Sequence, residues 1–406
     1  MIINSTIYGS QEVQQTTGNR VRFFDFDGTI LKTQYVTTGQ DATPPTLPTH
    51  NNLTFEEWNN PYTNIQSDID IGANYKTTDG KTYLKIKVYL TSLSSKQPVL
   101  RLQKTDNTIM TVNWGDGTSQ TTTSSGAVTI TKTTPYTDYA DYIVTIDCAS
   151  TYGFDDYIFN STAVRICSEA NLSEMVVSIK LAFYIQPIEK ISINKSCIIG
   201  IYAFYQAFSL KCVIVPKSNT ILAPHTYNNS RALEYIVFPN TIVTDVTSPS
   251  SALNTLYALK SLYLPNVSNI SIGNQLFTVE DVSHGIIDIP NSGFRQFFNV
   301  VALKINNGCQ TVGSEAFVSC SKLTKLDFPN TVTTIGGSAL LNCHALTTLI
   351  FRSTTPPTIT SNTLTTGSGT LTIKIYVPDS SVNDYKTATN WSSWANYIYP
   401  LSEIEP

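Results

Sequence analysis

Charged residues are scarce in this sequence, making up 14% of its 406 residues, whereas an average soluble protein holds about 25%. The 26 Lys and Arg residues nearly balance the 30 Asp and Glu residues, for a formal net charge of −4. This balance excludes a basic surface for nucleic acid and a polybasic stretch for an anionic membrane. A surface covered instead by Thr, Ser, Asn, Gln and Tyr is typical of an extracellular, β-rich protein.

Residues that build metal and redox sites are also few and scattered. The seven cysteines include no Cys-x-x-Cys pair, and an odd number cannot all be paired in disulfides. The four histidines stand far apart, without a second ligand at metal-site spacing. We therefore expect buried thiols and isolated imidazoles, and predict neither a metal nor a cofactor. These residues are Cys148, Cys167, Cys197, Cys212, Cys309, Cys320 and Cys343, and His50, His225, His284 and His344.

Long hydrophobic runs are absent as well. No apolar run approaches the ~18 to 20 residues of a membrane-spanning helix, so no membrane insertion is expected. Residues Met1–Ser5 do not begin a secretory leader, which needs a positive region followed by an apolar one. We still expect an extracellular or cell-surface protein, whose leader has been removed or which leaves the cell by another route. Hydrophobic residues reach 41%, enough for sizeable cores.

The second half of the chain repeats an apolar pattern that ends in a strand-like triplet. The clearest copies are Leu323–Pro329 and Leu346–Phe351, and earlier ones are Leu233–Pro239 and Leu259–Pro265. Such units cannot bury their apolar faces alone, so they predict a solenoid of stacked coils with parallel strands. The third apolar position of the pattern recurs at Ile193, Val215, Phe238, Leu264, Ile289, Ile305, Phe328 and Phe351.

Alternate residues of each strand should point inward and outward. Cys320 and Cys343 occupy the same repeat position, and we expect them to be small buried fillers rather than a disulfide.

The full pattern from Leu323 to Cys343, with Pro329, Ile335-Gly336 and Ala339, resembles the BspA-like leucine-rich repeat. The resemblance implies a solenoid over residues 151–374, a capping strand and short helix over 375–406, and a bacterial surface protein associated with attachment. Its drift between residues 240 and 300 leaves the conformation there open.

The first half predicts two small β modules after an N-terminal tail, residues 1–20. Within residues 21–78, alternating runs flank Asp27-Gly28, which is a hairpin signal. The order of this hairpin, a Pro-rich segment and Leu53-Thr-Phe with Trp58 resembles the Listeria–Bacteroides repeat, also known as the internalin B-type repeat. That resemblance implies a small β-grasp-like module.

A second interpretation of the same segment is enzymatic. Phe23–Ile30 matches the first motif of haloacid dehalogenase-type phosphatases, in which Asp25 would be the nucleophile and Asp27 the general acid, with magnesium between them. That chemistry needs a strand followed by a helix in a parallel α/β sheet. Here an alternating strand pattern continues to Val36, and Pro44-Pro45 opposes a helix soon after it. The phosphatase therefore remains a remote alternative.

Residues 79–150 predict an immunoglobulin-like sandwich. The Trp114-Gly-Asp116-Gly117 turn and the strand Tyr142–Ile146 resemble the polycystic-kidney-disease (PKD) domain. Trp114 should lie in the core and Asp116-Gly117 in a hairpin turn. The whole chain is thus predicted to be mainly β and multidomain: a β-grasp-like module, an Ig-like sandwich and a capped leucine-rich repeat solenoid.

No catalytic constellation survives, so the sequence favours a non-enzymatic extracellular binding protein, an adhesin or receptor-binding protein with a host or matrix protein or a glycan as ligand. A phage or prophage tail-associated accessory protein is the alternative, motivated by the missing leader. Outward strand positions place Ile214, Tyr235, Val237 and Tyr263 next to one another. We expect them to form an exposed apolar and aromatic binding patch, unless loops or middle repeats cover them.

Overall fold

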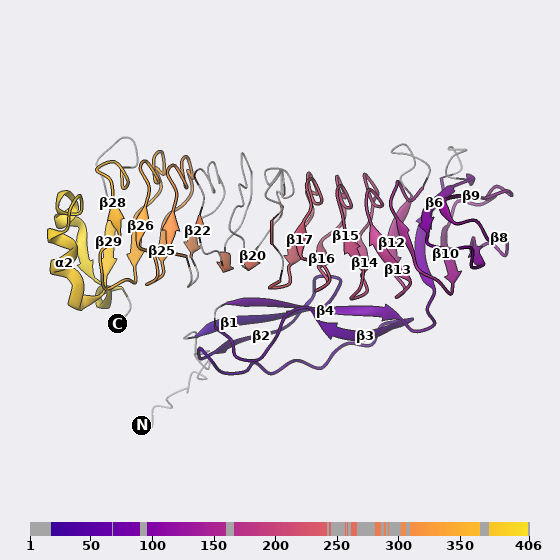
Figure 1. Cartoon of the computed structure of the whole chain (residues 1–406), viewed down its shortest axis with the longest axis horizontal. Helices are drawn as coiled ribbons and strands as arrows, with labels where there is room; N and C mark the ends of the chain where they lie inside the picture. Colours follow the sequence, from indigo (N-terminus) through magenta and orange to yellow (C-terminus); the bar gives the residue numbers. More distant parts are fainter. Residues whose placement is uncertain are drawn as a thin grey trace, which may run out of the picture.

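The computed structural model describes residues 18–404 except 67, 90–95, 160–165, 242, 245–255, 257, 259–260, 266–280, 286–287, 290, 292–301, 306–308 and 366–372. The chain is mainly β. Its largest part is a row of stacked coils, and a small N-terminal sheet lies alongside part of that row (Figure 1). The predicted tail, residues 1–20, falls mostly outside the described residues, and the first strand begins at Asn19.

Four strands form the N-terminal sheet, in the order β2-β1-β4-β3. The hairpin predicted around Asp27-Gly28 is confirmed, because β1 and β2 pair antiparallel on either side of it. Gly28 adopts a left-handed conformation, with φ 94°, which glycine tolerates without strain. β1 and β4 are a parallel pair, and β3 is antiparallel to β4. The strands are β1 (Asn19–Phe24), β2 (Ile30–Val36), β3 (Leu53–Trp58) and β4 (Ile69–Thr77).

The next segment folds as two sheets that continue into the solenoid. Their orders are β14-β12-β5-β10-β7-β8 and β15-β13-β11-β6-β9. Antiparallel pairs β5–β12 and β6–β11 join the segment to the first coils. The strands before the coils are β5 (Thr82–Lys87), β6 (Val99–Lys104), β7 (Met110–Asn113), β8 (Ser119–Thr122), β9 (Gly126–Thr131) and β10 (Asp141–Cys148). One hydrophobic core extends from Leu84 to Ile398, so this segment and the first coils share buried side chains.

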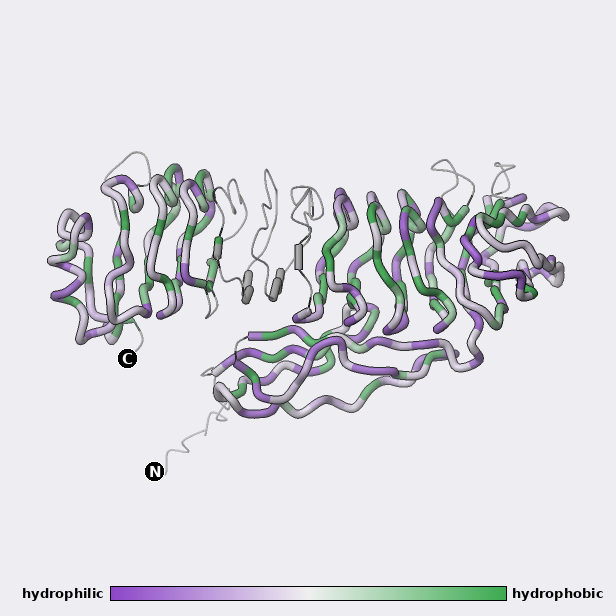
Figure 2. Tube along the Cα trace, in the orientation of Figure 1, coloured by the Kyte–Doolittle hydropathy of each residue, from purple (hydrophilic) through white to green (hydrophobic). Residues whose placement is uncertain are grey.

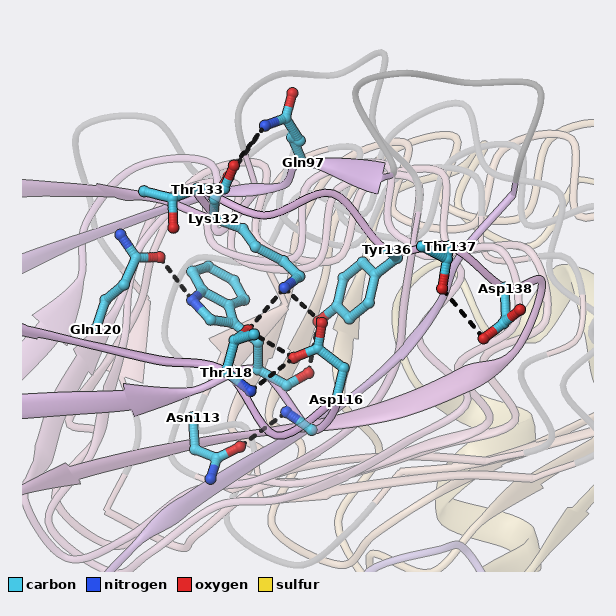
Figure 3. A network of polar contacts seen from close by, with 12 residues as sticks. Gln97, Asn113, Asp116, Thr118, Gln120, Lys132, Thr133, Tyr136, Thr137 and Asp138 are labelled. Carbon is cyan, nitrogen blue, oxygen red and sulfur yellow. Dashed lines mark hydrogen bonds and ion pairs between the residues drawn. The ribbon is translucent and has the colours of Figure 1, made fainter.

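A buried ion pair fixes the turn between β7 and β8 (Figure 3). The Lys132 ammonium is fully buried and lies 2.6 Å from the Asp116 carboxylate and 4.4 Å from the centre of the Tyr136 ring. The Tyr136 hydroxyl donates to the Trp114 carbonyl at 2.6 Å. Burial opposes the charged form of Asp116, yet its bonds to Lys132 and Thr118 hold its pKa below the usual value. The predictions that Trp114 is core and Asp116 lies in a turn are confirmed.

Where the coils are described, their short strands lie in two rows, and neighbouring coil strands within a row pair parallel as parts of several sheets. Along one row run β12 (Cys167–Asn171), β14 (Lys190–Ser192), β16 (Cys212–Ile214), β18 (Tyr235–Val237), β20 (Ser261–Pro265), β21 (Asp281–Gly285), β23 (Ala302–Lys304), β25 (Lys325–Phe328), β27 (Thr348–Phe351) and β29 (Lys374–Val377). Along the other run β11 (Tyr152–Phe154), β13 (Val176–Ile179), β15 (Ile198–Ile199), β17 (Ile221–Leu222), β19 (Val243–Thr244), β22 (Asp288–Ile289), β24 (Thr311–Val312), β26 (Thr334–Ile335) and β28 (Thr358–Ile359).

The predicted inward and outward alternation is seen in β25. Leu326 and Phe328 lie in the core, whereas Asp327 between them pairs with Arg352 at 2.8 Å. Figure 2 shows hydrophobic stretches recurring at matching places in successive coils. Cys320 and Cys343 are buried fillers, as predicted, and none of the seven cysteines forms a disulfide.

The predicted position of Ile289 in the repeat is wrong. The repeat pattern predicts Ile289 in the same row as Leu264 and Phe328, but Leu264 pairs with His284 in β21. Ile289 lies in β22 and pairs with Val312 of the other sheet. The two rows were confused because both sheets bury an apolar residue at the end of a short strand, so the sequence pattern alone does not tell them apart.

The predicted C-terminal cap is present. After β29 the chain forms η2 (Asp379–Ser381), α2 (Val382–Thr387), η3 (Ser392–Tyr397), β30 (Ile398–Pro400) and η4 (Leu401–Glu403). The Trp391 ring packs edge-on against Phe351 at 5.0 Å, and its indole nitrogen donates to the Pro357 carbonyl at 2.8 Å. The cap thereby covers the apolar end of the last coil.

Substitution of Gly336 should be costly because the backbone of the preceding coil lies close to it. A Cβ on Gly336 would lie 2.4 Å from the Ser314 backbone nitrogen, whereas one on Gly337 would meet side-chain atoms at 3.1 Å or more. We expect Gly336→Ala to lower the free energy of unfolding by about 2 kcal/mol and Gly337→Ala to change it much less. Chemical denaturation measures both; equal losses would contradict the close approach.

The buried ion pair predicts that its two residues differ in how much stability their replacement costs. Asp116→Asn leaves the Lys132 charge buried without its partner and should lower the free energy of unfolding by about 3 kcal/mol. Lys132→Met should lower it less, since the Asp116 carboxylate that remains is 18% exposed and keeps its hydrogen bonds from Thr118. The Asp116 contribution is complete above the ordinary carboxyl pKa of 3.8 and is lost as the pH falls through the lower folded value. Urea unfolding at neutral and acidic pH measures these effects, and a smaller loss in Asp116→Asn than in Lys132→Met would refute the argument.

Candidate functional site

The predicted binding patch lies beneath the N-terminal sheet. Ile214 is 3% exposed and Val237 is fully buried, so the expectation that they form an open surface is wrong. They point outward from the solenoid as predicted, but strand β4 contacts β14, β16 and β18 there. Tyr235 is partly buried in the same contact, and the side chain of Tyr263 lies outside the described residues. The cluster that forms comprises Phe24, Phe26, Leu53, Ala73, Tyr75, Cys212, Ile214 and Val237.

Two adjacent asparagines make this contact specific. The Asn59 amide donates to the carbonyls of Val215 and Val237 at 3.0 and 2.8 Å. The Asn60 amide donates to the Phe238 carbonyl at 2.7 Å, and its oxygen accepts from the Asn240 backbone at 2.6 Å. Both asparagines are buried. Because they satisfy backbone groups where strands β16 and β18 end, the N-terminal sheet is held in one position on the solenoid.

The aspartates of the phosphatase motif lie in the hairpin turn directly after β1, a strand that pairs parallel with β4 but is followed by another strand instead of a helix. Asp25 is buried and its carboxylate lies 2.8 Å from the His50 ring nitrogen. The Asp27 carboxylate forms an ion pair with the Lys190 ammonium at 3.5 Å. Burial opposes the charged form of Asp27, but its bonds to Thr29 and the Lys190 charge lower its pKa. Since the antiparallel strand β2 follows directly, the strand-to-helix geometry of the phosphatase is not present here.

A cleft of about 330 Å³ opens where the N-terminal sheet, the segment of β5 to β10 and the first coils meet. Its wall combines Asp27 and Glu169 with Lys85, Lys190 and His50. The two carboxylates and two ammonium groups balance, so the cleft has no strong preference for ligand charge. Within the residues that the structure describes, no three His, Cys, Asp or Glu side chains gather to hold a metal ion. The helices of that part are also too short or too polar to span a membrane.

The aromatic surface that remains open lies on the turns after β11, β13, β15 and β17. Tyr184 stacks on Tyr205 of the next coil, with ring centroids 4.7 Å apart and planes 13° apart. Tyr202 stacks on His225 at 4.6 Å and 3°. Tyr157 packs edge-on against Tyr184 at 5.3 Å. Together with Leu181 and Asn228, these residues enclose a cavity of about 290 Å³, and we call them the tyrosine cluster.

The turn backbone places these rings in two columns. Leu181, Tyr202 and His225 share one left-handed position, with φ 59°, 56° and 57°. Hydrogen bonds join the turns, for example from the Phe183 nitrogen to the Ala203 oxygen at 3.0 Å. The second column, Tyr184, Tyr205 and Asn228, lies three residues further along each turn.

Later coils show that the turn does not need aromatic residues. Glu315 and Ser338 occupy the left-handed position of Tyr202, with φ 58° and 55°. Val318 and Leu341 stand three residues further on, where the first coils have Tyr184 and Tyr205. The same backbone is therefore built with and without tyrosines, and the aromatic cluster is a property of this surface rather than of the repeat.

The coils and their two rows of parallel strands define a leucine-rich repeat protein. A family model described as "BspA type Leucine rich repeat region" matches residues 178–288 and 287–388, in six copies. The chain therefore belongs to the BspA-type leucine-rich repeat family. The resemblance predicted for the second half of the sequence is confirmed, whereas the Listeria–Bacteroides and PKD resemblances of the first half stay predictions.

Three solved bacterial structures are similar to this chain at low identity. A leucine-rich repeat protein from Bacteroides ovatus is 16% identical, with 57% of this chain and 83% of that chain covered and a TM-score of 0.26. The pneumococcal vaccine antigen PcpA is 14% identical, with 63% and 84% covered and a TM-score of 0.32. A leucine-rich cell surface protein from Faecalibacterium prausnitzii is 12% identical, with 63% and 83% covered and a TM-score of 0.25. No curated protein sequence matches the chain.

Sequence reasoning missed the tyrosine cluster, although a signal was present. Ala182-Phe183 and Ala203-Phe204 each precede a tyrosine, and later copies of the same element do not. The sequence gives no comparable sign that the N-terminal sheet covers the predicted patch. Nothing in Asn59-Asn60 indicates which distant carbonyls their side-chain amides bind.

Removing the asparagine amides should loosen the N-terminal sheet. We expect the double variant Asn59→Ala, Asn60→Ala to lower the free energy of unfolding by about 2 to 4 kcal/mol, because carbonyls of the solenoid lose their donors. Hydrogen exchange should rise at residues 212–215 and 235–240, with Asn51→Ala, on an exposed loop, as the control. Unchanged exchange in the double variant would show that the sheet is held by other contacts.

Proposed function

We propose that this protein is a non-enzymatic, extracellular or cell-surface binding protein of the adhesin or receptor-binding type, which contacts its ligand through the tyrosine cluster. The observation that carries the proposal is the confinement of Tyr157, Tyr184, Tyr202 and Tyr205 to one partly exposed surface. Soluble surfaces seldom gather aromatic residues without a ligand or partner, and tyrosine is enriched where proteins bind.

The BspA-type family supports a binding role rather than catalysis, since repeat families of this kind are typically non-catalytic. The hairpin context of Asp25 and Asp27 removes the geometric basis of the phosphatase alternative. The N-terminal sheet covers Ile214 and Val237 on the strand face of the solenoid. The turns are therefore the better candidate for ligand contact. The ligand is then expected to meet the edge of the coils, away from the N-terminal sheet.

The first two modules serve in this proposal as supports for the solenoid. The strand order β2-β1-β4-β3 with a parallel β1–β4 pair supports a β-grasp-like Listeria–Bacteroides module over residues 21–78. The two sheets around Trp114 support a PKD or Ig-like sandwich over residues 79–150. Since both sheets of that sandwich pair with the first coils, it would act as the N-terminal cap of the array.

The proposal is tested by binding of the full chain to surfaces coated with gastric mucin, fibronectin, collagen or laminin. We expect the wild type to bind at least one coat, and Tyr184→Ala with Tyr205→Ala to reduce that binding about tenfold or more. The matched control is Val318→Ala with Leu341→Ala, at the corresponding positions of two later coils. Equal binding by the tyrosine variant and wild type, or a failure of the wild type on every coat, would contradict the proposal.

A further inference from the structure

We propose that the tyrosine cluster recognises an uncharged saccharide, bound by the phenol hydroxyls and Asn228 at the mouth of the cavity. This inference rests on the proposed function, in which the cluster is the contact surface, and it assigns the chemistry of the ligand. Four observations carry it: the unused hydroxyls, the lack of charge, the orientation of the rings and the size of the cavity.

The hydroxyls of Tyr157, Tyr184, Tyr202 and Tyr205 make no hydrogen bond to any part of the protein that the structure describes. Three buried tyrosines elsewhere in the described chain do use this group: Tyr136, Tyr152 and Tyr385 each donate to a protein oxygen. A phenol hydroxyl both donates and accepts. Four of them around one cavity therefore offer a set of neutral donors and acceptors, which matches the hydroxyl groups of a sugar.

No carboxylate, lysine or arginine lines this cavity. Burial, and next the neighbouring Tyr205, Tyr157 and Tyr202, raise the pKa of Tyr184, so its phenol stays neutral at physiological pH. An anionic ligand such as a sulfated or sialylated glycan would find no lysine or arginine to pair with here. The cleft beside Asp27 and Lys190, by contrast, is lined by charges of both signs. The lack of acidic and basic side chains is therefore particular to the tyrosine cluster.

The stacking of the rings disfavours a cationic ligand. Cations bind over the face of an aromatic ring, where its quadrupole is negative. In the cluster Tyr184 and Tyr205 cover a face of each other, and so do Tyr202 and His225. Stacking thus removes one face of each ring from a cation, and the hydroxyls at the ring edges remain as polar handles on an apolar body.

The cavity volume of about 290 Å³ lies at the small end of ligand sites, which span roughly 300 to 1,000 Å³. Its two columns of side chains follow the stacking direction of the coils, from Tyr184 to Asn228. A short run of sugar units fits such a site better than a folded protein surface does. The side amide of Asn228, 3.3 Å from the His225 ring, adds a directional neutral group at the far end.

The test uses the full chain on a printed array of defined neutral and acidic oligosaccharides. We expect binding to neutral members, and a loss of about tenfold in affinity for Tyr184→Phe with Tyr205→Phe. These substitutions keep the stacked rings and remove the hydroxyls, so the fold is preserved. Tyr139→Phe, at an exposed tyrosine outside the cluster, is the control. Binding should also be nearly independent of salt, since no charge takes part.

Two results would overturn the inference while leaving the proposed function intact. The first is tyrosine-dependent binding to the mucin or matrix coats combined with binding to acidic glycans alone, or to no glycan. The second is inhibition of the coat binding by tetramethylammonium, which would assign a cation to the cluster. Neutral-glycan binding that both phenylalanine substitutions leave unchanged would instead place the saccharide site elsewhere on the molecule.

Discussion

The structure depends on one constraint: the backbone of each coil must be satisfied by the coil next to it. Hydrogen bonds such as Gly336 nitrogen to Val312 oxygen, at 2.7 Å, join neighbouring turns, and Leu326 or Phe328 fill the space that the coils enclose. An end coil has no neighbour on one side. At the start of the array, β5 and β6 pair with the strands of the first coils. At its end, Trp391 packs on Phe351 of the last coil.

The same constraint explains why the strand positions and the turn positions of the surface differ. Strand positions repeat with the ladder, so their outward side chains form a continuous face, and a wide apolar part of it around Ile214 is covered by the N-terminal sheet. Turn positions project away from the ladder. Their side chains can vary without disturbing it, as Tyr202, Glu315 and Ser338 do at one backbone conformation. Recognition is therefore most easily placed on the turns.

The sequence predicted what local pattern controls. The repeat, the cap, the Asp27-Gly28 hairpin and the core position of Trp114 follow from apolar spacing and turn residues, and the structure has them. It could not predict contacts between distant segments: the cover over Val237 depends on Asn59, 178 residues away in sequence. Ile289 was misassigned because both sheets use the same kind of apolar residue. The tyrosine cluster needed the coil-to-coil alignment before its members could be seen to meet.

All seven cysteines are buried as thiols, and none is joined to another. Burial raises the pKa of Cys167 to about 12, so this sulfur stays protonated and chemically inert. Cohesion thus comes from packing and the backbone ladder, with no covalent cross-link between coils. Such a molecule can reach the same shape in the reducing interior of a cell and in the oxidising medium outside it, without help from a thiol oxidase.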